Sequence, residues 1–331
     1  MMGRSDDRID HTLEARLPTA AGDEAAGSAT SRALPRYRRV AGQAPAMLLT
    51  PRDLAIVEDV WRFRLLTTTQ IETLRACDPE TGNRFASRLT LTRRLKLLFH
   101  HRYLRRIARP LAQGSREPVY LLDSAGARLL SQRHGEVTAS PPSRLPAPAA
   151  LDHLLAIGQM RLSLTAAQSL PVARRSGYGL VEWLPGEKVR FRISLEETGR
   201  RRQNVSIVPD GAAIVRLSHG SSAVRHYAFI EVDRGTEPQR TLAGKCQAYL
   251  AYWQSGGFAR DFSVPVGLGF RVLFVAPSSK RAQTILKAVG AVTGPRRLFR
   301  VALEQDIVPQ RVLEAVWLDG ATGEATAPFA G

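Results

Sequence analysis

The chain has 331 residues, 44% of them apolar, so it is long enough for about two domains and supplies enough apolar side chains for their cores. It carries 47 Lys and Arg against 30 Asp and Glu, a formal net charge of +17. This excess favours a polyanionic partner, with nucleic acid as the first candidate. The composition excludes a disordered chain, and no apolar run is long enough for a membrane-spanning helix.

The cysteines and the N-terminal residues indicate the cellular compartment of the protein. Cys77 and Cys246 lie far apart and neither has a CxxC neighbour, so the sequence predicts neither a disulfide framework nor a zinc cluster. The N-terminus lacks the charged-then-apolar order of a signal peptide. We therefore expect a cytoplasmic protein without a membrane partner.

Breaks in composition divide the chain into segments. Residues 1–46 are rich in small and charged residues without periodicity, which predicts a disordered leader. Residues 135–149 contain four prolines and read as a linker. The linker separates a basic segment, 47–134, from an α/β segment, 150–318, and we expect a flexible tail at 319–331.

The basic segment opens with the signals of a helix N-terminus. In TPRD, Thr50 is placed as the N-cap, Pro51 takes the first helical position and Asp53 follows three residues after the cap. A second short helix is expected after Thr67–Thr69, and a turn at 78–83 leads to a third.

The third helix, in TLTRRLKLLFHHRYL, presents a cationic face opposite a buried stripe of Leu91, Leu95, Leu98 and Phe99. Two strand-like runs follow, YLRRIARPL and EPVYLLD, joined by a turn at AQGSR, and a last helix begins at Ser124. Three helices, a hairpin and a helix are the order of a winged helix-turn-helix. In that fold the third helix enters the major groove and the hairpin touches the backbone.

Most of the excess charge lies in this segment together with the residues just before it. Residues 36–135 contain 19 Lys and Arg and eight Asp and Glu, which accounts for +11 of the net +17. We therefore predict double-stranded DNA as the partner; the alternative is a solvated basic face on a winged helix that binds protein. The predicted DNA contacts lie on the third helix and the hairpin: Thr92, Arg93, Arg94, Lys96, Arg105, Arg106 and Arg116.

The α/β segment has the order helix, three or four strands, helix, strand, followed by a further helix and strand. Helices are expected at 150–168, 239–253 and 279–290. Strand-like runs occupy 179–185, 187–193, 205–217, 226–233, 270–278 and 298–304.

Carboxylates fall at two places in these runs. Asp210 follows Pro209 within one predicted strand, and Glu231 and Asp233 end the next. Alternation along a strand puts Glu231 and Asp233 on one face, and the three carboxylates converge if the strands are neighbours. Hard oxygen ligands at this density predict a site for Mg²⁺ or Mn²⁺ that could activate water.

This layout resembles the PD-(D/E)XK nuclease superfamily and implies a restriction-endonuclease-like αβββαβ domain. Pro209 and Asp210 match the first half of its motif and Glu231 matches the acidic position of the second half, but Asp233 stands where the superfamily carries Lys. On the next helix, Lys245 resembles the migrated partner seen in some branches. The resemblance thus implies Asp210, Glu231, Asp233 and Lys245 as catalytic candidates, the three carboxylates being the metal ligands.

The alternative is a site without catalysis. Glu231, Asp233 and Glu237 would then form structural ion pairs with Arg234, Arg240 or Lys245. The missing Lys at position 233 favours this non-catalytic interpretation over a nuclease.

Together the two halves resemble the replication-relaxation family of plasmid and other mobile-element proteins. The matching residues, over about 48–280, are LTPRDLAIVEDVWRFRLLTTTQI, TRRLKLLFHHRYLRRIARPL, EPVYLLDSAGARLL and IEVDRGTEPQRTLAGKCQAYLAYW. The resemblance implies a DNA-binding protein of plasmid or mobile-element replication or relaxation, in the bacterial cytoplasm at nucleoid or plasmid DNA, with other replication or relaxation proteins as partners. A metal-dependent endonuclease or nickase and a transcriptional regulator of a mobile element are the alternatives.

Overall fold

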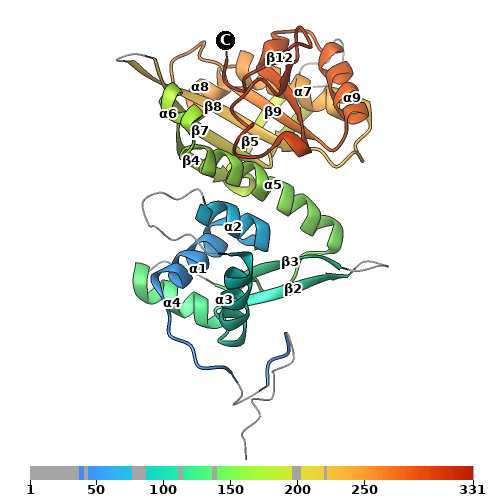
Figure 1. Cartoon of the computed structure of the whole chain (residues 1–331). Coiled ribbons are helices and arrows are strands. Elements are labelled where there is room, and N and C mark those ends of the chain that lie inside the picture. Colours follow the sequence, from blue (N-terminus) through green and yellow to red (C-terminus); the bar gives the residue numbers. More distant parts are fainter. Residues whose placement is uncertain are drawn as a thin grey trace, which may run out of the picture. The chain divides into compact units, whose positions relative to one another are not determined.

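The computed structural model describes residues 37–40, 44–76, 87–110, 115–135, 140–195, 203–219 and 222–330 (Figure 1). Most of the predicted leader lies outside these residues, as do Cys77 and the turn predicted at 78–83. The described residues form a mixed α/β structure, which confirms the predicted α/β class. None of the helices found among them is long and apolar enough to cross a membrane.

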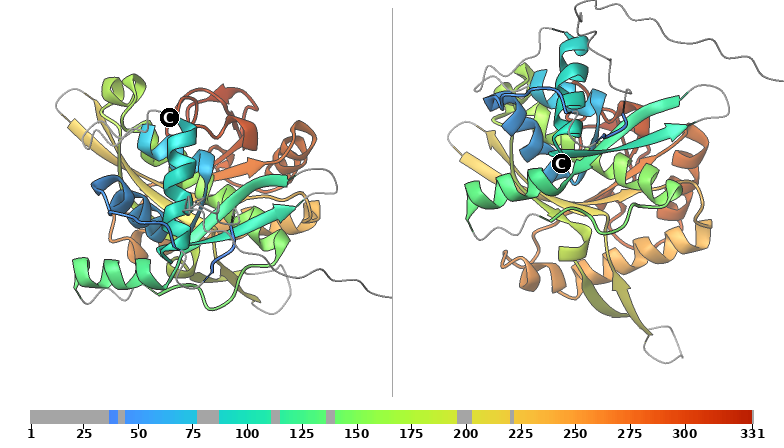
Figure 2. Two further views of the ribbon diagram at one scale, coloured as in Figure 1. Left: turned by 60° about the horizontal axis from the view of Figure 1, so that its bottom comes forward. Right: turned by 90° about the horizontal axis from the view of Figure 1, so that it is seen from below.

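The first part of the chain combines helices with a small antiparallel sheet. In chain order its elements are α1 (Pro51–Phe63), β1 (Leu65–Thr67), α2 (Thr68–Ala76), α3 (Arg88–His100), β2 (Leu104–Pro110), β3 (Ser115–Leu122) and α4 (Ser124–His134). The strand β3 lies between β1 and β2 and runs antiparallel to both, and Figure 2 shows β2 and β3 side by side as a hairpin. The predicted helices and hairpin are present, and the unpredicted β1 adds a third strand.

Local sequence explains how these elements begin and pack. Thr50 and Asp53 form a capping box at the start of α1, in which the Thr50 N–H donates to the Asp53 carboxylate over 2.8 Å. Leu91, Leu95 and Leu98 of α3 are fully buried in one apolar cluster with residues of α1, α2 and β3. The apolar stripe predicted for the third helix is therefore confirmed.

The second part contains a larger number of elements. They are α5 (Pro148–Ala167), α6 (Pro171–Ser176), β4 (Gly179–Pro185), β5 (Phe191–Leu195), β6 (Gln203–Ile207), β7 (Gly211–His219), β8 (Ser222–Val232), α7 (Gln239–Gln254), α8 (Gly257–Asp261), β9 (Arg271–Ala276), α9 (Ser279–Gly290), β10 (Phe299–Leu303), β11 (Trp317–Asp319) and β12 (Ala325–Thr326). Short 3₁₀ helices lie at Gly186–Lys188, Arg296–Leu298 and Glu304–Asp306.

A seven-stranded mixed sheet organises this part, with the order β12-β11-β10-β9-β8-β7-β4. β8, β9 and β10 are parallel to one another, and α7 and α9 provide the crossovers between them. The remaining neighbours pair antiparallel. β5 and β6 form a separate two-stranded sheet.

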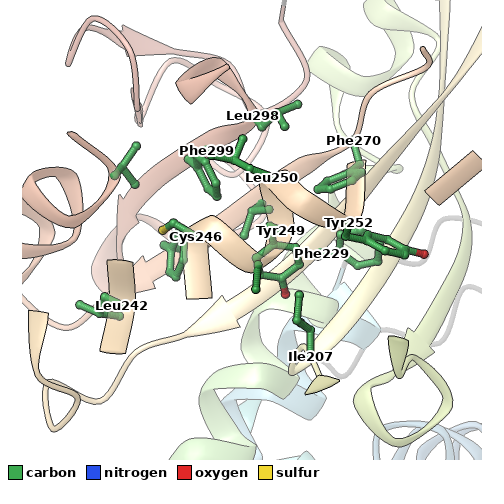
Figure 3. Close-up of a cluster of buried hydrophobic side chains, with 14 of the residues drawn as sticks. Ile207, Phe229, Leu242, Cys246, Tyr249, Leu250, Tyr252, Phe270, Leu298 and Phe299 are labelled. Atoms are coloured by element: carbon green, nitrogen blue, oxygen red, sulfur yellow. The ribbon is translucent and has the colours of Figure 1, made fainter. Parts of the chain in front are cut away.

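Alternation along the central strands separates two apolar layers. Phe229 of β8 and Phe274 of β9 pack with α7 and α9, in a cluster that includes Tyr249 and Tyr252 (Figure 3). Ile230 and Val232, the intervening residues of β8, pack with α5 on the other face. The end of β8 is therefore enclosed by α7 and α9 on one side and α5 on the other.

The helix α5 contacts both parts of the chain, which belong to one compact unit. Its first residue, Pro148, is the last proline of the predicted linker and occupies the first helical turn. Leu151 and Leu155 pack against Leu121 of β3, whereas Met160 packs against the seven-stranded sheet.

Two predicted segments are wrong. The run 205–217 is not one strand, because Pro209 lacks an N–H and interrupts it; β6 pairs with β5, and β7 enters the large sheet. The expected tail is ordered up to residue 330, since β11 and β12 extend the sheet and Trp317 and Phe329 are buried. Burial of these two large side chains offsets the entropy of ordering the segment.

Candidate functional site

The acidic stretch of the sequence lies at the carboxyl end of β8. Glu231 is paired with Phe274 of β9, and Asp233 follows the strand with its N–H donating to the Val275 carbonyl over 2.9 Å. Glu231 and Asp233 are buried, with only 4% and 8% of their surfaces exposed. Their partners lie on α7 and α9 while Val232 packs toward α5, so the predicted alternation is confirmed.

Glu231 is held by two side chains of α7. Lys245 Nζ lies 2.9 Å from Oε2, and the Tyr249 hydroxyl donates to Oε1 over 2.5 Å. The pKa of Glu231 is raised to about 7, chiefly by burial; the Lys245 ammonium opposes this increase and the Asp210 carboxylate adds to it. The spacing of Lys245 and Tyr249, one helical turn apart, brings both to the same carboxylate.

Asp210 lies in the turn between β6 and β7 rather than within a strand. Its Oδ2 accepts from the Val232 N–H over 2.7 Å, and His153 Nε2 of α5 lies 3.2 Å from the same oxygen. The hydrogen bond with Asp210 raises the pKa of His153, although burial opposes it. Gly186 allows the backbone to pass close to this turn, since a Cβ at position 186 would lie 2.2 Å from the Pro209 carbonyl oxygen.

Asp233 is turned toward α9. Arg281 donates to both carboxylate oxygens, over 2.5 Å from Nε and 2.7 Å from Nη2, and the Gly235 N–H donates to Oδ2 over 2.9 Å. Nη2 of Arg281 also donates to the Glu237 carbonyl. The hydrogen bonds with Asp233 raise the pKa of Arg281, although burial opposes them.

Several of these residues line one pocket of about 460 Å³. Its lining includes His153, Glu231, Asp233, Glu237 and Lys245. The structure therefore brings Asp210, Glu231 and Lys245 together around one strand end, as the sequence predicts, and directs Asp233 to a separate arginine.

The donor set, as placed, does not form a centre for Mg²⁺ or Mn²⁺. A hard cation requires several oxygen ligands directed to one point. Among the described residues no three His, Cys, Asp or Glu side chains are gathered in this way. Positive side chains of the protein neutralise two of the carboxylates: Lys245 pairs with Glu231 and Arg281 pairs with Asp233. Metal binding by Asp210, Glu231 and Asp233 stays a prediction.

The outer face of α3 carries part of the predicted DNA contacts. Arg93 and Lys96 lie on the side of the helix opposite Leu91, Leu95 and Leu98, and Arg93 is exposed. In the described part of the chain neither Arg93 nor Lys96 has a hydrogen-bond or ion-pair partner. Thr92 flanks this face, and its hydroxyl donates to the Arg88 carbonyl.

Other predicted contacts have protein partners. Arg94 donates to Asp53 from Nε over 3.0 Å and to the Leu48 carbonyl from Nη2 over 3.0 Å, which ties α3 to the start of α1. The Arg106 guanidinium lies 3.8 Å from the centre of the Tyr37 ring. Arg116 Nη1 lies 3.1 Å from Asp152 of α5. Arg105, in β2, is half-buried.

Two residues of the strand end, His153 and Arg281, are not among those predicted from the sequence. His153 interrupts the apolar pattern of α5, and Arg281 places a cation in the first turn of α9, where the helix dipole disfavours it. Each was therefore a signal that an acidic partner was needed. The identity of that partner depends on tertiary packing and cannot be read from the sequence.

Comparison with known proteins identifies the family. The replication-relaxation family model matches residues 58–264, more than half of the chain, and the chain therefore belongs to this family. No curated protein is significantly similar in sequence. A solved structure titled as that of the restriction endonuclease FokI aligns at 13% identity and a TM-score of 0.24, covering 79% of this chain and 45% of that chain. A TM-score this low does not indicate a shared fold.

Proposed function

We propose that this member of the replication-relaxation family binds duplex DNA during replication or relaxation of a plasmid or other mobile element. Residues 51–134 would act as a winged helix, with α3 as the recognition helix and β2–β3 as the wing. The observation that carries the proposal is the outer face of α3, where Arg93 and Lys96 lack protein partners among the described residues. Cations without acidic partners are available for phosphate or base contacts.

The distribution of charge supports the same proposal. Residues 36–135 hold +11 of the net +17, while the buried carboxylates at the end of β8 are neutralised by Lys245 and Arg281. Phosphate contacts release condensed counterions, so we expect affinity to fall steeply with salt. Under this proposal the protein acts in the bacterial cytoplasm, at plasmid or nucleoid DNA.

A salt-dependent binding titration tests the proposal. Arg93→Ala combined with Lys96→Ala should weaken binding to a labelled random-sequence duplex about tenfold and lower the slope of log K against log salt by about 2. The matched control is Lys280→Ala with Lys287→Ala, which removes two exposed charges from α9. Absence of binding by the wild type at low salt, or an equal loss in both double variants, would contradict the proposal.

Metal-dependent DNA cleavage is the second candidate, and the contact between Lys245 and Glu231 is the observation in its favour. An acidic side chain beside a lysine in an open pocket is an arrangement that could act on a phosphodiester. Because the carboxylates already have protein partners, we expect supercoiled plasmid to stay intact with Mg²⁺ or Mn²⁺. Cleavage would be established instead if the wild type nicks the plasmid, Asp210→Ala abolishes the nicking and Glu324→Ala does not. Glu324 is the control because it is an exposed carboxylate.

A further inference from the structure

Leu89, in the first turn of α3, is one of several large apolar side chains that lie exposed on the described surface. It is 59% exposed, although the helix buries Leu91, Leu95 and Leu98 completely. Leu89 belongs to none of the apolar clusters formed by the described residues. Within the described part of the chain, core packing therefore does not explain a leucine at this position.

The position of Leu89 relates it to the cationic face of α3. Residues 89, 93 and 96 are spaced i, i+4 and i+7, so Leu89, Arg93 and Lys96 share one face of the helix. Leu89 lies at the N-terminal end of that face. The neighbouring Arg88 is turned away and bound by Glu72 and Glu117.

The N-terminal residues of a recognition helix are those that contact base edges in the major groove. In that groove thymine is the base that presents a methyl group, at C5, and apolar side chains recognise it by contact. An exposed leucine that shares a helix face with two cations, neither of which has a partner in the segments that the structure describes, thus combines an apolar group for a base with charges for the backbone. A second protein is a less suitable occupant, because the cations surrounding Leu89 would be desolvated without acidic partners.

We propose that Leu89 is a specificity-determining residue that reads the C5-methyl group of thymine in the DNA bound by α3. This inference rests on the proposed function and adds a base preference to it. Arg93 and Lys96 supply affinity that does not depend on sequence, and Leu89 supplies discrimination at one position.

Replacement of thymine by deoxyuridine tests the inference on the full chain. Duplexes enriched by the wild type from a random library are synthesised with thymine or with deoxyuridine, one position at a time. At the position read by Leu89, loss of the methyl should weaken binding about fourfold, the equivalent of one buried methyl-sized group. Leu89→Ala should bind both duplexes equally, and Leu89→Met should keep the preference for thymine.

The matched control is Leu145→Ala, which truncates a leucine that is 50% exposed outside α3 and should keep the discrimination of the wild type. Equal wild-type affinity for both duplexes at every position, or discrimination that persists in Leu89→Ala, overturns the inference. Salt-dependent binding without sensitivity to the methyl group refutes the role of Leu89 but leaves the proposed function intact. Absence of binding to any duplex refutes the proposed function as well.

Discussion

His100, at the end of α3, is a buried histidine whose Nε2 has no hydrogen-bond partner in the described part of the structure. Burial lowers its pKa below the ordinary 6.5, and the positive charges of Lys96 and Arg39 lower it further. The folded state therefore disfavours the protonated ring more than the unfolded chain does. The stability that this neutral histidine contributes is present above pH 6.5 and is lost as the pH falls through the folded pKa.

We predict that the free energy of unfolding of the wild type decreases on acidification below pH 6.5, and that His100→Phe reduces this decrease. Urea denaturation over a series of pH values measures the effect. His100→Gln, which removes the charge but keeps a polar group, should show the same flattening. Parallel curves for the wild type and both variants would mean that His100 does not set the acid sensitivity.

At the scale of the element, α3 places two adjacent arginines in different roles. Arg93 is exposed, whereas Arg94 is bound to the fully buried Asp53 of the α1 capping box. We predict that Arg94→Ala lowers the free energy of unfolding by about 2–3 kcal/mol, because Asp53 then loses its cation. Arg93→Ala should change it by less than about 0.5 kcal/mol.

The comparison of these neighbours is made by urea denaturation and DNA titration on the same samples. Arg93→Ala is expected to weaken DNA binding without loss of stability. Arg94→Ala is expected to lower stability without weakening DNA binding, when binding is measured on folded protein. Equal destabilisation by the two substitutions would show that the contact between Arg94 and Asp53 does not support the fold.

These elements also show how far the sequence could predict the structure. The period of the leucines fixes which face of α3 is buried, and alternation fixes the face of β8 that carries Glu231. Neither pattern can specify that Asp53, from a helix 41 residues earlier, takes Arg94 out of the cationic face. Short strands such as β11 and β12 have no period long enough to recognise, so the tail was predicted wrongly.

At the scale of the whole molecule, the end of β8 joins three helices to the central sheet. His153 of α5, Lys245 of α7 and Arg281 of α9 each bind a carboxylate there. The carboxylates were visible in the sequence, but two of these three cations were not, since they lie 57 and 48 residues from their partners. Two ion pairs and the contact between His153 and Asp210 thus link both faces of the sheet at one place.

We expect a divalent cation to have little effect on this region of the wild-type protein. Since the carboxylates have cations from the protein, millimolar Mn²⁺ should leave the thermal unfolding temperature of the wild type nearly unchanged. Lys245→Met should destabilise the protein by about 3 kcal/mol or more, because it leaves Glu231 buried without its cation. Mn²⁺ should then bind the folded variant and raise its unfolding temperature by mass action.

Arg260→Met, which breaks an exposed ion pair with Asp261, is the control that should gain nothing from Mn²⁺. If Mn²⁺ instead stabilises the wild type, and Asp210→Asn removes that stabilisation, the metal site predicted from the sequence is correct.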